Sequence, residues 1–412
     1  MKLVIAEKPS VAMALASVLG ARTRKDGYVE GNGYIVSWCV GHLVGLCDAS
    51  EYDEKYKKWR YDDLPIVPEC WKHKVLEGTK KQFGILKKLM RDSKVDEVIC
   101  ATDAGREGEL IFRLVYEQAG CKKPMKRLWI SSMEEQAIKD GFASLKDGSC
   151  YDSLYQSALC RAKADWLVGI NASRLFSVLY NQNLKVGRVQ TPTLAMIVDR
   201  NQKIKEFTKE KYYMAHIKFD DMDAVTENFQ KKEDADKVAA ECQERMCEVE
   251  KDDVKEKTVR PPKLYDLTTL QREANRMFGY TAQQTLDAVQ EMYEQKLVTY
   301  PRTDSQYLTD EMGESTETLI QMLLGKMPYA EGLEYQPDVS KVLNSKKVSD
   351  HHAIIPTMEV AKADIGELKE RSRKILYLIS ARVLTATADP YIYESHKCQI
   401  TCNYHTFYLC LL

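Results

Sequence analysis

A chain of 412 residues is too long to fold around one core, so about two to four domains are expected. Hydrophobic residues make up 44% of it and charged residues 29%, which is ordinary for a globular protein. No apolar run is long enough for a bilayer, and Glu7 and Lys8 interrupt the apolar N-terminus before a signal-peptide core forms. This pattern argues against a membrane protein and favours a cytoplasmic one.

The charge limits where a nucleic-acid-binding surface could lie, and the cysteine spacing limits which scaffolds are possible. The formal net charge of -1 is no global polyanion-binding signature, so any basic surface must be local. The twelve cysteines contain no CxxC pair. Their spacing therefore argues against a zinc or disulfide scaffold, and we expect small buried hydrophobic side chains instead.

Two segments within the first 120 residues share one pattern, in which a strand is followed by a polar turn and a helix. Residues 2–6 (KLVIA) predict a strand, and a helical face then continues to Gly20. Residues 98–101 predict a second buried strand, which leads through TDAGREG into a helix that Gly120 closes. This alternation indicates a parallel sheet with its chemistry at the carboxyl edge. Glu7 and Asp103 both lie just past strand ends, so we expect them to face one crevice.

From about residue 150 the pattern becomes helical. Residues 212–219 (YYMAHIKF) alternate as a strand should, and a charged stretch follows to about residue 260. Arg260-Pro261-Pro262 is the clearest linker signal in the chain. A helical block lies beyond it, in which Thr281 and Gln284 predict a capping box.

The motifs together resemble a known family. IAEKPS and ATDAGREGELIF resemble the two signatures of a toprim domain, and KRLWISS at residues 126–132 resembles bacterial topoisomerase III, a type IA DNA topoisomerase. The resemblance runs from Lys2 to about Phe407. It implies a multidomain α/β and α fold: a Rossmann-like toprim domain over residues 1–150, a helical DNA-binding segment over 151–208, a helical gate domain over 263–383, and an incomplete β-rich arch over 209–262 and 384–412.

The toprim carboxylates suit a hard cation. Oxygen ligands at adjoining strand ends hold Mg²⁺, and we expect Asp103 and Glu7 to bind it. Glu107 is expected to help from the first turn of a helix, although an ordinary helix-start carboxylate is the alternative. Many toprim domains have Asp-x-Asp here, whereas this chain has Gly105 in the second position. One Mg²⁺ is therefore expected, with a weak or absent second site.

The expected nucleophile lies in LVTYPRTDS, residues 297–305. A residue before proline is pushed towards extended geometry, which suits a side chain presented from a loop. The resemblance implies that Tyr300 is the catalytic tyrosine, with Arg302 sharing the phosphate. In SDHHAIIPT, residues 349–357, His351 matches the family histidine near the scissile phosphate and His352 is its less certain neighbour.

The implied reaction is ATP-independent, and the chain contains no GxxxxGK[ST] motif. Tyr300 attacks single-stranded DNA and becomes joined to the 5′ phosphate. Glu7 protonates the leaving 3′ hydroxyl, and Lys8 and Arg302 offset phosphoryl charge. Another strand passes through the gap before religation, which relaxes negative supercoils or decatenates DNA. A monomer is expected.

A single-strand groove is expected ahead of the gate. VGRVQTPTLAM forms a turn before an apolar helix, and amides at such a helix start suit phosphate. Two tryptophans are candidates for base stacking, although burial in the core is the alternative for both. The candidate DNA-binding residues are Trp59, Trp166, Arg174, Gly187, Arg188, Val189, Gln190, Thr191, Pro192 and Arg302.

The last residues, YHTFYLCLL, no longer resemble the family, whose members continue further. We expect a truncated chain whose apolar end leaves strand edges unpaired. The alternative function is thus a fragment that binds single-stranded DNA without completing relaxation. A third, another toprim enzyme such as a primase or nuclease, is disfavoured because those enzymes lack the tyrosine gate.

Overall fold

A computed structural model describes residues 1–131, 133–333, 336–348 and 351–411. Ser132 in the KRLWISS motif and Ser349 and Asp350 in SDHHAIIPT lie outside the described residues. The chain forms two units: Met1–Ala195 with Lys263–Thr387, and Met196–Pro262 with Ala388–Leu412. The predicted linker at residues 260–262 falls at one of the crossings between them.

The first unit is built on a sheet with the strand order β2-β3-β4-β1-β7-β8-β9. Its central strands β4, β1, β7 and β8 are parallel, as predicted, and both flanks are antiparallel. The strands are β1 (Lys2–Ala6), β2 (Thr23–Lys25), β3 (Tyr28–Gly31), β4 (Tyr34–Trp38), β7 (Glu97–Ala101), β8 (Met125–Arg127) and β9 (Lys146–Asp147).

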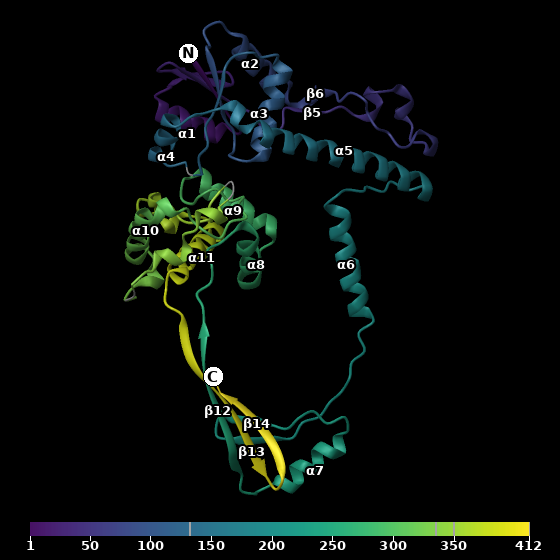
Figure 1. The fold of residues 1–412 in the computed structure, drawn as a ribbon, viewed down its shortest axis with the longest axis vertical. Coiled ribbons are helices and arrows are strands. Elements are labelled where there is room, and N and C mark those ends of the chain that lie inside the picture. Colours follow the sequence, from purple (N-terminus) through teal and green to yellow (C-terminus); the bar gives the residue numbers. More distant parts are fainter. Residues whose placement is uncertain (132, 334–335, 349–350, 412) are drawn as a thin grey trace. The chain divides into compact units, whose positions relative to one another are not determined.

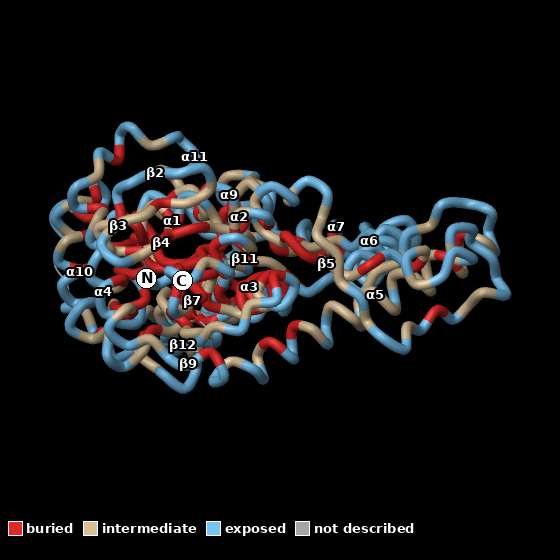
Figure 2. Tube along the Cα trace, turned by 90° about the horizontal axis from the view of Figure 1, so that it is seen from above, coloured by how far each residue is buried: buried red, intermediate tan, exposed pale blue. Residues whose placement is uncertain are grey.

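Helices cover both faces of this sheet because its strands are apolar on both sides. Val4 and Ala6 pack on the side of α1 and α4, whereas Leu3 and Ile5 pack on the side of α2 and α3. In Figure 2, buried segments, drawn in red, lie at β4, β7 and α3. The helices are α1 (Pro9–Leu19), α2 (Lys80–Arg91), α3 (Arg106–Ala119) and α4 (Glu135–Ala143). As predicted, Gly20 and Gly120 end α1 and α3 in the left-handed conformation.

Beyond the sheet, the chain continues into longer helices (Figure 1). A small antiparallel pair, β5 (Val44–Leu46) and β6 (His73–Val75), precedes α2. The long α5 (Asp152–Tyr180) contacts α3. After a turn, α6 (Gln190–Lys205) begins, and it crosses from the first unit into the second.

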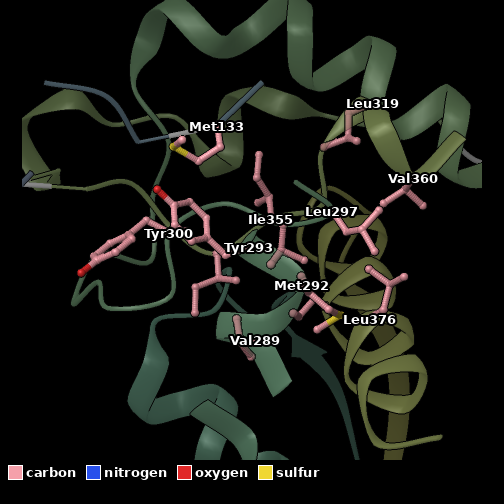
Figure 3. Packing of buried hydrophobic residues seen from close by; sticks show 14 of the residues in the cluster. Met133, Val289, Met292, Tyr293, Leu297, Tyr300, Leu319, Ile355, Val360 and Leu376 are labelled. Atoms are coloured by element: carbon pink, nitrogen blue, oxygen red, sulfur yellow. The ribbon is translucent and has the colours of Figure 1, made fainter. Parts of the chain in front are cut away.

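A helical block carries the candidate tyrosine. Its helices are α8 (Leu267–Phe278), α9 (Ala282–Glu294), α10 (Gly313–Lys326) and α11 (Glu370–Ala386). The predicted capping box at Thr281 and Gln284 is present, with both reciprocal hydrogen bonds formed. An isolated bridge between Val298 and Pro356 aligns the LVTYP segment with the IIPT segment. The block and the α1 side of the sheet share one hydrophobic core, part of which Figure 3 shows.

The second unit is a five-stranded antiparallel sheet with the order β10-β11-β14-β13-β12. Its elements are β10 (His216–Phe219), β11 (Met222–Val225), α7 (Lys232–Cys242), β12 (Glu248–Val259), β13 (Tyr391–Cys402) and β14 (His405–Leu411). Its small core includes Val238 from α7 with Ile400, Phe407 and Leu409 from the hairpin of β13 and β14.

Three sequence-based expectations need correction. The expectation of unpaired strand edges at the C-terminus is wrong, because β14 lies between β11 and β13 and buries Phe407 and Leu409. The strand predicted from residue 212 begins at His216, and Tyr213 forms only an isolated bridge with Phe229. Five of the twelve free cysteines are buried, but four are exposed.

The last helix of the block, α11, continues to Ala386, past residue 383, where the gate is expected to end. Within the part of the chain that the structure describes, no helix is long and apolar enough to cross a membrane.

Candidate active site

Two carboxylates meet at the carboxyl edge of the central sheet. β1 and β7 pair in parallel, so the residues that follow them emerge side by side. Glu7 follows β1 directly, and the backbone N–H of Asp103 donates a hydrogen bond to Glu7 Oε2 at 3.3 Å. Gly108 lets α3 approach this turn, since a Cβ there would lie 2.1 Å from the Asp103 carbonyl oxygen. The predicted convergence of Glu7 and Asp103 is therefore present.

The environment of Glu7 favours its protonated form. The side chain is only 8% exposed. Burial, followed by the nearby charge of Asp103, raises the pKa of Glu7 to about 7, although Lys8 and Arg302 oppose the shift. Near neutral pH the carboxyl group is thus balanced between holding and releasing a proton, which suits a general acid.

A buried ion pair, missed in the sequence analysis, supports the Asp103 turn. Arg127 and Glu109 are each 1% exposed, and Nε of Arg127 lies 3.1 Å from Glu109 Oε2. The same guanidinium donates to the carbonyl oxygens of Thr102 and Asp103, both at 2.7 Å. The signal was present, since Glu109 belongs to the GREGE motif and Arg127 to KRLWISS, but only the fold shows that they meet.

Tyr300 lies directly against this turn. Its hydroxyl donates a hydrogen bond to Asp103 Oδ2 at 2.8 Å, and its side chain is buried. Its ring packs edge-on against Tyr293, with 5.4 Å between ring centroids, and Figure 3 shows the two rings beside Met133. Burial and then Asp103 raise the pKa of Tyr300, while Arg302 lowers it. The free site therefore holds a neutral phenol whose proton is already shared with a carboxylate.

The His351 ring also packs against the Tyr300 ring, in a tilted arrangement with 4.3 Å between ring centroids. Burial lowers the pKa of His351 to about 4, although the Ala104 backbone opposes the shift, so the ring is neutral at physiological pH. Its Nδ1 shares a 3.0 Å hydrogen bond with Ser131 Oγ. The expected phosphate contact would then come from a neutral N–H. His352 does not join the site, because its Nδ1 faces its neighbour's carbonyl oxygen at 2.8 Å.

These groups line a cavity of about 490 Å³. Charged side chains of both signs surround it, which suits a phosphodiester together with a cation. The lining includes Glu7, Asp103, Glu107, Arg161, Tyr300 and Arg302.

The expected metal site is assembled only in part. The nearby negative charge of Asp103 contributes to raising the pKa of Glu7, and a divalent cation would relieve this repulsion. Glu107 lines the same cavity, but its Oε1 bonds His42 Nε2 at 2.7 Å. Among the described residues, no group of three or more His, Cys, Asp or Glu side chains is placed to hold a metal ion. The two strand-end carboxylates would supply oxygen ligands of the kind that Mg²⁺ prefers, and the roles of Glu7, Asp103 and Glu107 in metal binding stay predictions.

Lys8 points to a different partner from the one expected. Its Nζ lies 3.3 Å from Glu294 Oε1 at the end of α9. It still acts on the site at a distance, since its charge lowers the pKa of Glu7. Arg302 lines the cavity as expected.

A second cavity of about 570 Å³ lies beside α5, where the sequence predicted single-strand contacts. The guanidinium of Arg174 stacks over Trp59, 5.3 Å from the ring centroid, and donates to the Tyr56 carbonyl oxygen at 2.9 Å. Trp59 is 45% exposed and Arg174 only 7%. The exposed ring is thus the better placed of the two for a base, while Arg174 supports it. Lys57 and Lys185 also line this cavity.

For Trp166, the structure favours the packing alternative. Its ring contacts Tyr52 and Trp71 edge-on, with centroids 5.7 and 5.4 Å away. Its Nε1 donates to the Cys47 carbonyl oxygen at 3.0 Å.

The turn over Gly187–Pro192 leads into α6 as predicted, with Gln190, Thr191 and Pro192 in the first helical turn. The Gly187 N–H donates to Thr191 Oγ1 at 3.1 Å. Val189 is exposed. Arg188 is bidentate on Asp165, at 2.6 and 3.2 Å, so a phosphate would have to compete with that carboxylate.

Comparison with known proteins agrees with this geometry. Residues 2–133 match the family model for the toprim domain, and residues 149–410 match the one for DNA topoisomerase. The chain is 44% identical over 98% of its length to DNA topoisomerase 3 of Shouchella clausii, and 43% identical to that of Bacillus cereus. It spans 57% of the length of each of these relatives. Full-length topoisomerase I from Thermotoga maritima has the same fold, with a TM-score of 0.73 and 24% identity over 99% of this chain and 64% of that one. The chain therefore belongs to the type IA DNA topoisomerase family.

Proposed function

We propose that this chain carries the cleavage site of an ATP-independent type IA topoisomerase, which cuts a single DNA strand through a 5′-phosphotyrosine link and reseals it after strand passage. The observation that supports this most directly is the 2.8 Å hydrogen bond from the Tyr300 hydroxyl to Asp103, inside a cavity that Arg302 also lines. Burying a phenol against the half-buried carboxylate of Asp103 lowers the stability of the folded chain. The same hydrogen bond suits a tyrosine that must lose its proton to act as a nucleophile.

The proposed cleavage step moves two protons. Tyr300 transfers its phenolic proton to Asp103 as the phenolic oxygen bonds to phosphorus, and the bond from phosphorus to the 3′ oxygen breaks. Glu7 gives its proton to the departing 3′ oxygen, in keeping with its raised pKa. Arg302 offsets charge on the transferring group. Religation reverses each transfer, so the site returns to its starting state.

Mg²⁺ is the proposed cofactor, and Glu7 and Asp103 would hold it in their ionised forms. When bound, it would neutralise and orient phosphate oxygens near the reacting bond. The steps assigned above belong to the chain's own side chains.

Single-stranded DNA is the proposed substrate, and it would reach the cavity along the α5 surface. Trp59 would stack on a base there, and Lys185, which lines the same cavity, would contact phosphate. Relaxation or decatenation by a monomer extends this proposal to the whole protein. The alternative, binding without relaxation, is favoured by one observation: Lys8, which was expected to offset phosphoryl charge, is paired with Glu294.

The decisive experiment is adduct formation on a labelled single-stranded oligonucleotide, followed by denaturation. Tyr300→Phe keeps the ring and its packing but removes the nucleophilic oxygen, so the covalent adduct should vanish while binding persists. Tyr293→Phe is the matched control, since it is also a buried tyrosine whose ring touches that of Tyr300. This variant should still form the adduct. Adduct formation by Tyr300→Phe would show that another residue is the nucleophile.

A further inference from the structure

Two backbone amides of the tyrosine block are bonded to the toprim domain instead of to their own block. The Tyr300 N–H donates to the Ser131 carbonyl oxygen at 3.3 Å, and the Met358 N–H donates to Glu134 Oε1 at 3.2 Å. Amides next to them in sequence behave differently. Thr299 N–H donates to Ile355 O, and Thr357 N–H donates to Leu297 O, both within the block and both at 2.9 Å.

Most contacts across this boundary use side chains already assigned to the chemistry. Tyr300 meets Asp103, His351 meets Ser131, and Lys8 meets Glu294. Glu134 is different, because it precedes α4 and does not line the 490 Å³ cavity. Within the described part of the chain, it therefore contacts the block at a place outside that cavity.

We propose that Glu134 is a latch residue, a positioning residue whose carboxylate holds the tyrosine block closed on the toprim crevice. The proposal rests on the proposed function, because a block that must part from the crevice for strand passage needs contacts that form only when it is closed. Glu134 binds the corner just after the IIPT segment, where Thr357 Oγ1 also caps the Lys296 carbonyl oxygen. That corner leads directly to Tyr300 through residues 297–299.

The charges at this corner support the assignment. Lys362 follows Met358 on the same short turn. Its hydrogen bond to Glu359 is the main cause that raises its pKa, and the negative charge of Glu134 adds a smaller contribution. The pKa of Glu135, the first residue of α4, is lowered chiefly by Lys139 on its own helix, with smaller contributions from Lys296 and Lys362. The charges across the boundary are thus attractive but secondary to the hydrogen bond that Glu134 accepts from Met358. Such exposed pairs are screened by salt, so the latch should weaken as ionic strength rises.

The latch can be measured without DNA by hydrogen exchange of the 412-residue chain. In the closed state the amides of Tyr300 and Met358 are protected by acceptors on the toprim side, so they exchange when the block parts from it. The amides of Thr299 and Thr357 exchange only when the block itself opens. The ratio between the exchange rates of the two sets of amides distinguishes separation of the block from the toprim domain from unfolding of the block itself.

Glu134→Ala should speed exchange at both Tyr300 and Met358 by about three- to tenfold. This is the loss expected for one ordinary hydrogen bond, because the charge of Glu134 is screened near the surface. Thr299 and Thr357 should be unchanged. Glu134→Gln keeps an acceptor oxygen and should show a smaller rise. Gln136→Ala is the matched control, because the Gln136 side chain donates a hydrogen bond to Asp140 on its own helix at 2.8 Å. This variant should behave as the unaltered chain.

Several results would overturn the latch. Faster exchange at Met358 alone, with Tyr300 unchanged, would mean a local bond with no hold on the block. An equal increase in the exchange rates of Thr299 and Thr357 would mean that the substitution unfolds the block. An increase in Glu134→Gln as large as in Glu134→Ala would mean that Glu134 does not act as a hydrogen-bond acceptor. These outcomes differ from a failure of the proposed function, which the Tyr300→Phe adduct experiment tests independently.

Discussion

Replacing Glu7 with Gln should stabilise the first unit at alkaline pH, although Glu7 is proposed to be catalytic. The carboxyl group is buried beside Asp103, and its pKa is raised from 4.5 to about 7. Between those two values the folded chain binds more protons at this position than the unfolded chain does. The free energy of unfolding therefore falls as pH rises through that window, and the loss is complete above about pH 7.

The size of the effect follows from the shift. One pKa unit corresponds to about 1.4 kcal/mol, so Glu7 costs the folded chain at most about 3 kcal/mol once it is ionised. Glu7→Gln removes this cost. The variant should be more stable than the original chain at pH 8 by up to that amount, and the difference should disappear near pH 4.5.

Urea titration in the presence of a chelator is a suitable assay, because a bound cation would mask the effect. Tryptophan fluorescence reports on the first unit alone, since all five tryptophans lie within it. Glu107→Gln is the control with the opposite sign, because its hydrogen bond to His42 lowers the pKa of Glu107. A Glu7→Gln variant that is no more stable than the original chain at pH 8 would refute the assignment of a costly buried carboxylate.

Three further outcomes are expected. Asp103→Asn keeps an acceptor for Tyr300 but removes the proposed base, so the rate of adduct formation should fall about 100-fold or more while filter binding of the single strand persists; an unchanged rate would exclude Asp103 as the base. Chelating Mg²⁺ should slow religation more than it weakens single-strand binding, and an equal loss of both would contradict the placement of the metal at Asp103. Trp59→Ala should weaken single-strand binding by about 1 to 3 kcal/mol without altering its salt dependence, whereas Arg188→Ala should lower the slope against log salt by about 0.7; the reverse pattern in a salt titration would reassign both residues.

The sheet and its crevice could be predicted because their signals are local. A short apolar strand, a polar turn and a helix closed by glycine are all readable within about twenty residues. Since parallel strands end at one edge, Glu7 and Asp103 could be expected to meet although they lie far apart in sequence. No comparable rule predicts where the Tyr300 side chain lies. Its place in the site followed from the resemblance, and its bond to Asp103 required the fold.

What escaped prediction depends on partners from distant segments. Glu107 appeared to be free for a metal, but His42 occupies it, and Lys8 is similarly engaged by Glu294. Arg174 was a candidate phosphate ligand by residue type. Its burial beneath Trp59 depends on how distant segments pack, which the sequence does not show. The C-terminal strand was misjudged for the same reason, because a sequence ending in apolar residues does not show which strands will flank it.

The pKa shifts of the two groups proposed to react fit a cleavage step that needs no outside energy source. Burial raises the pKa of both Tyr300 and Glu7, so before DNA binds, each tends to hold the proton that the reaction needs. In the proposed cleavage one proton passes from Tyr300 to Asp103 and another from Glu7 to the 3′ oxygen. The number of protons in the site plus DNA is unchanged, and one phosphodiester bond replaces another. Reversal needs only that the 3′ hydroxyl stay nearby, so the free energy of the broken bond is retained in the phosphotyrosine and no nucleotide hydrolysis is required to reseal the strand.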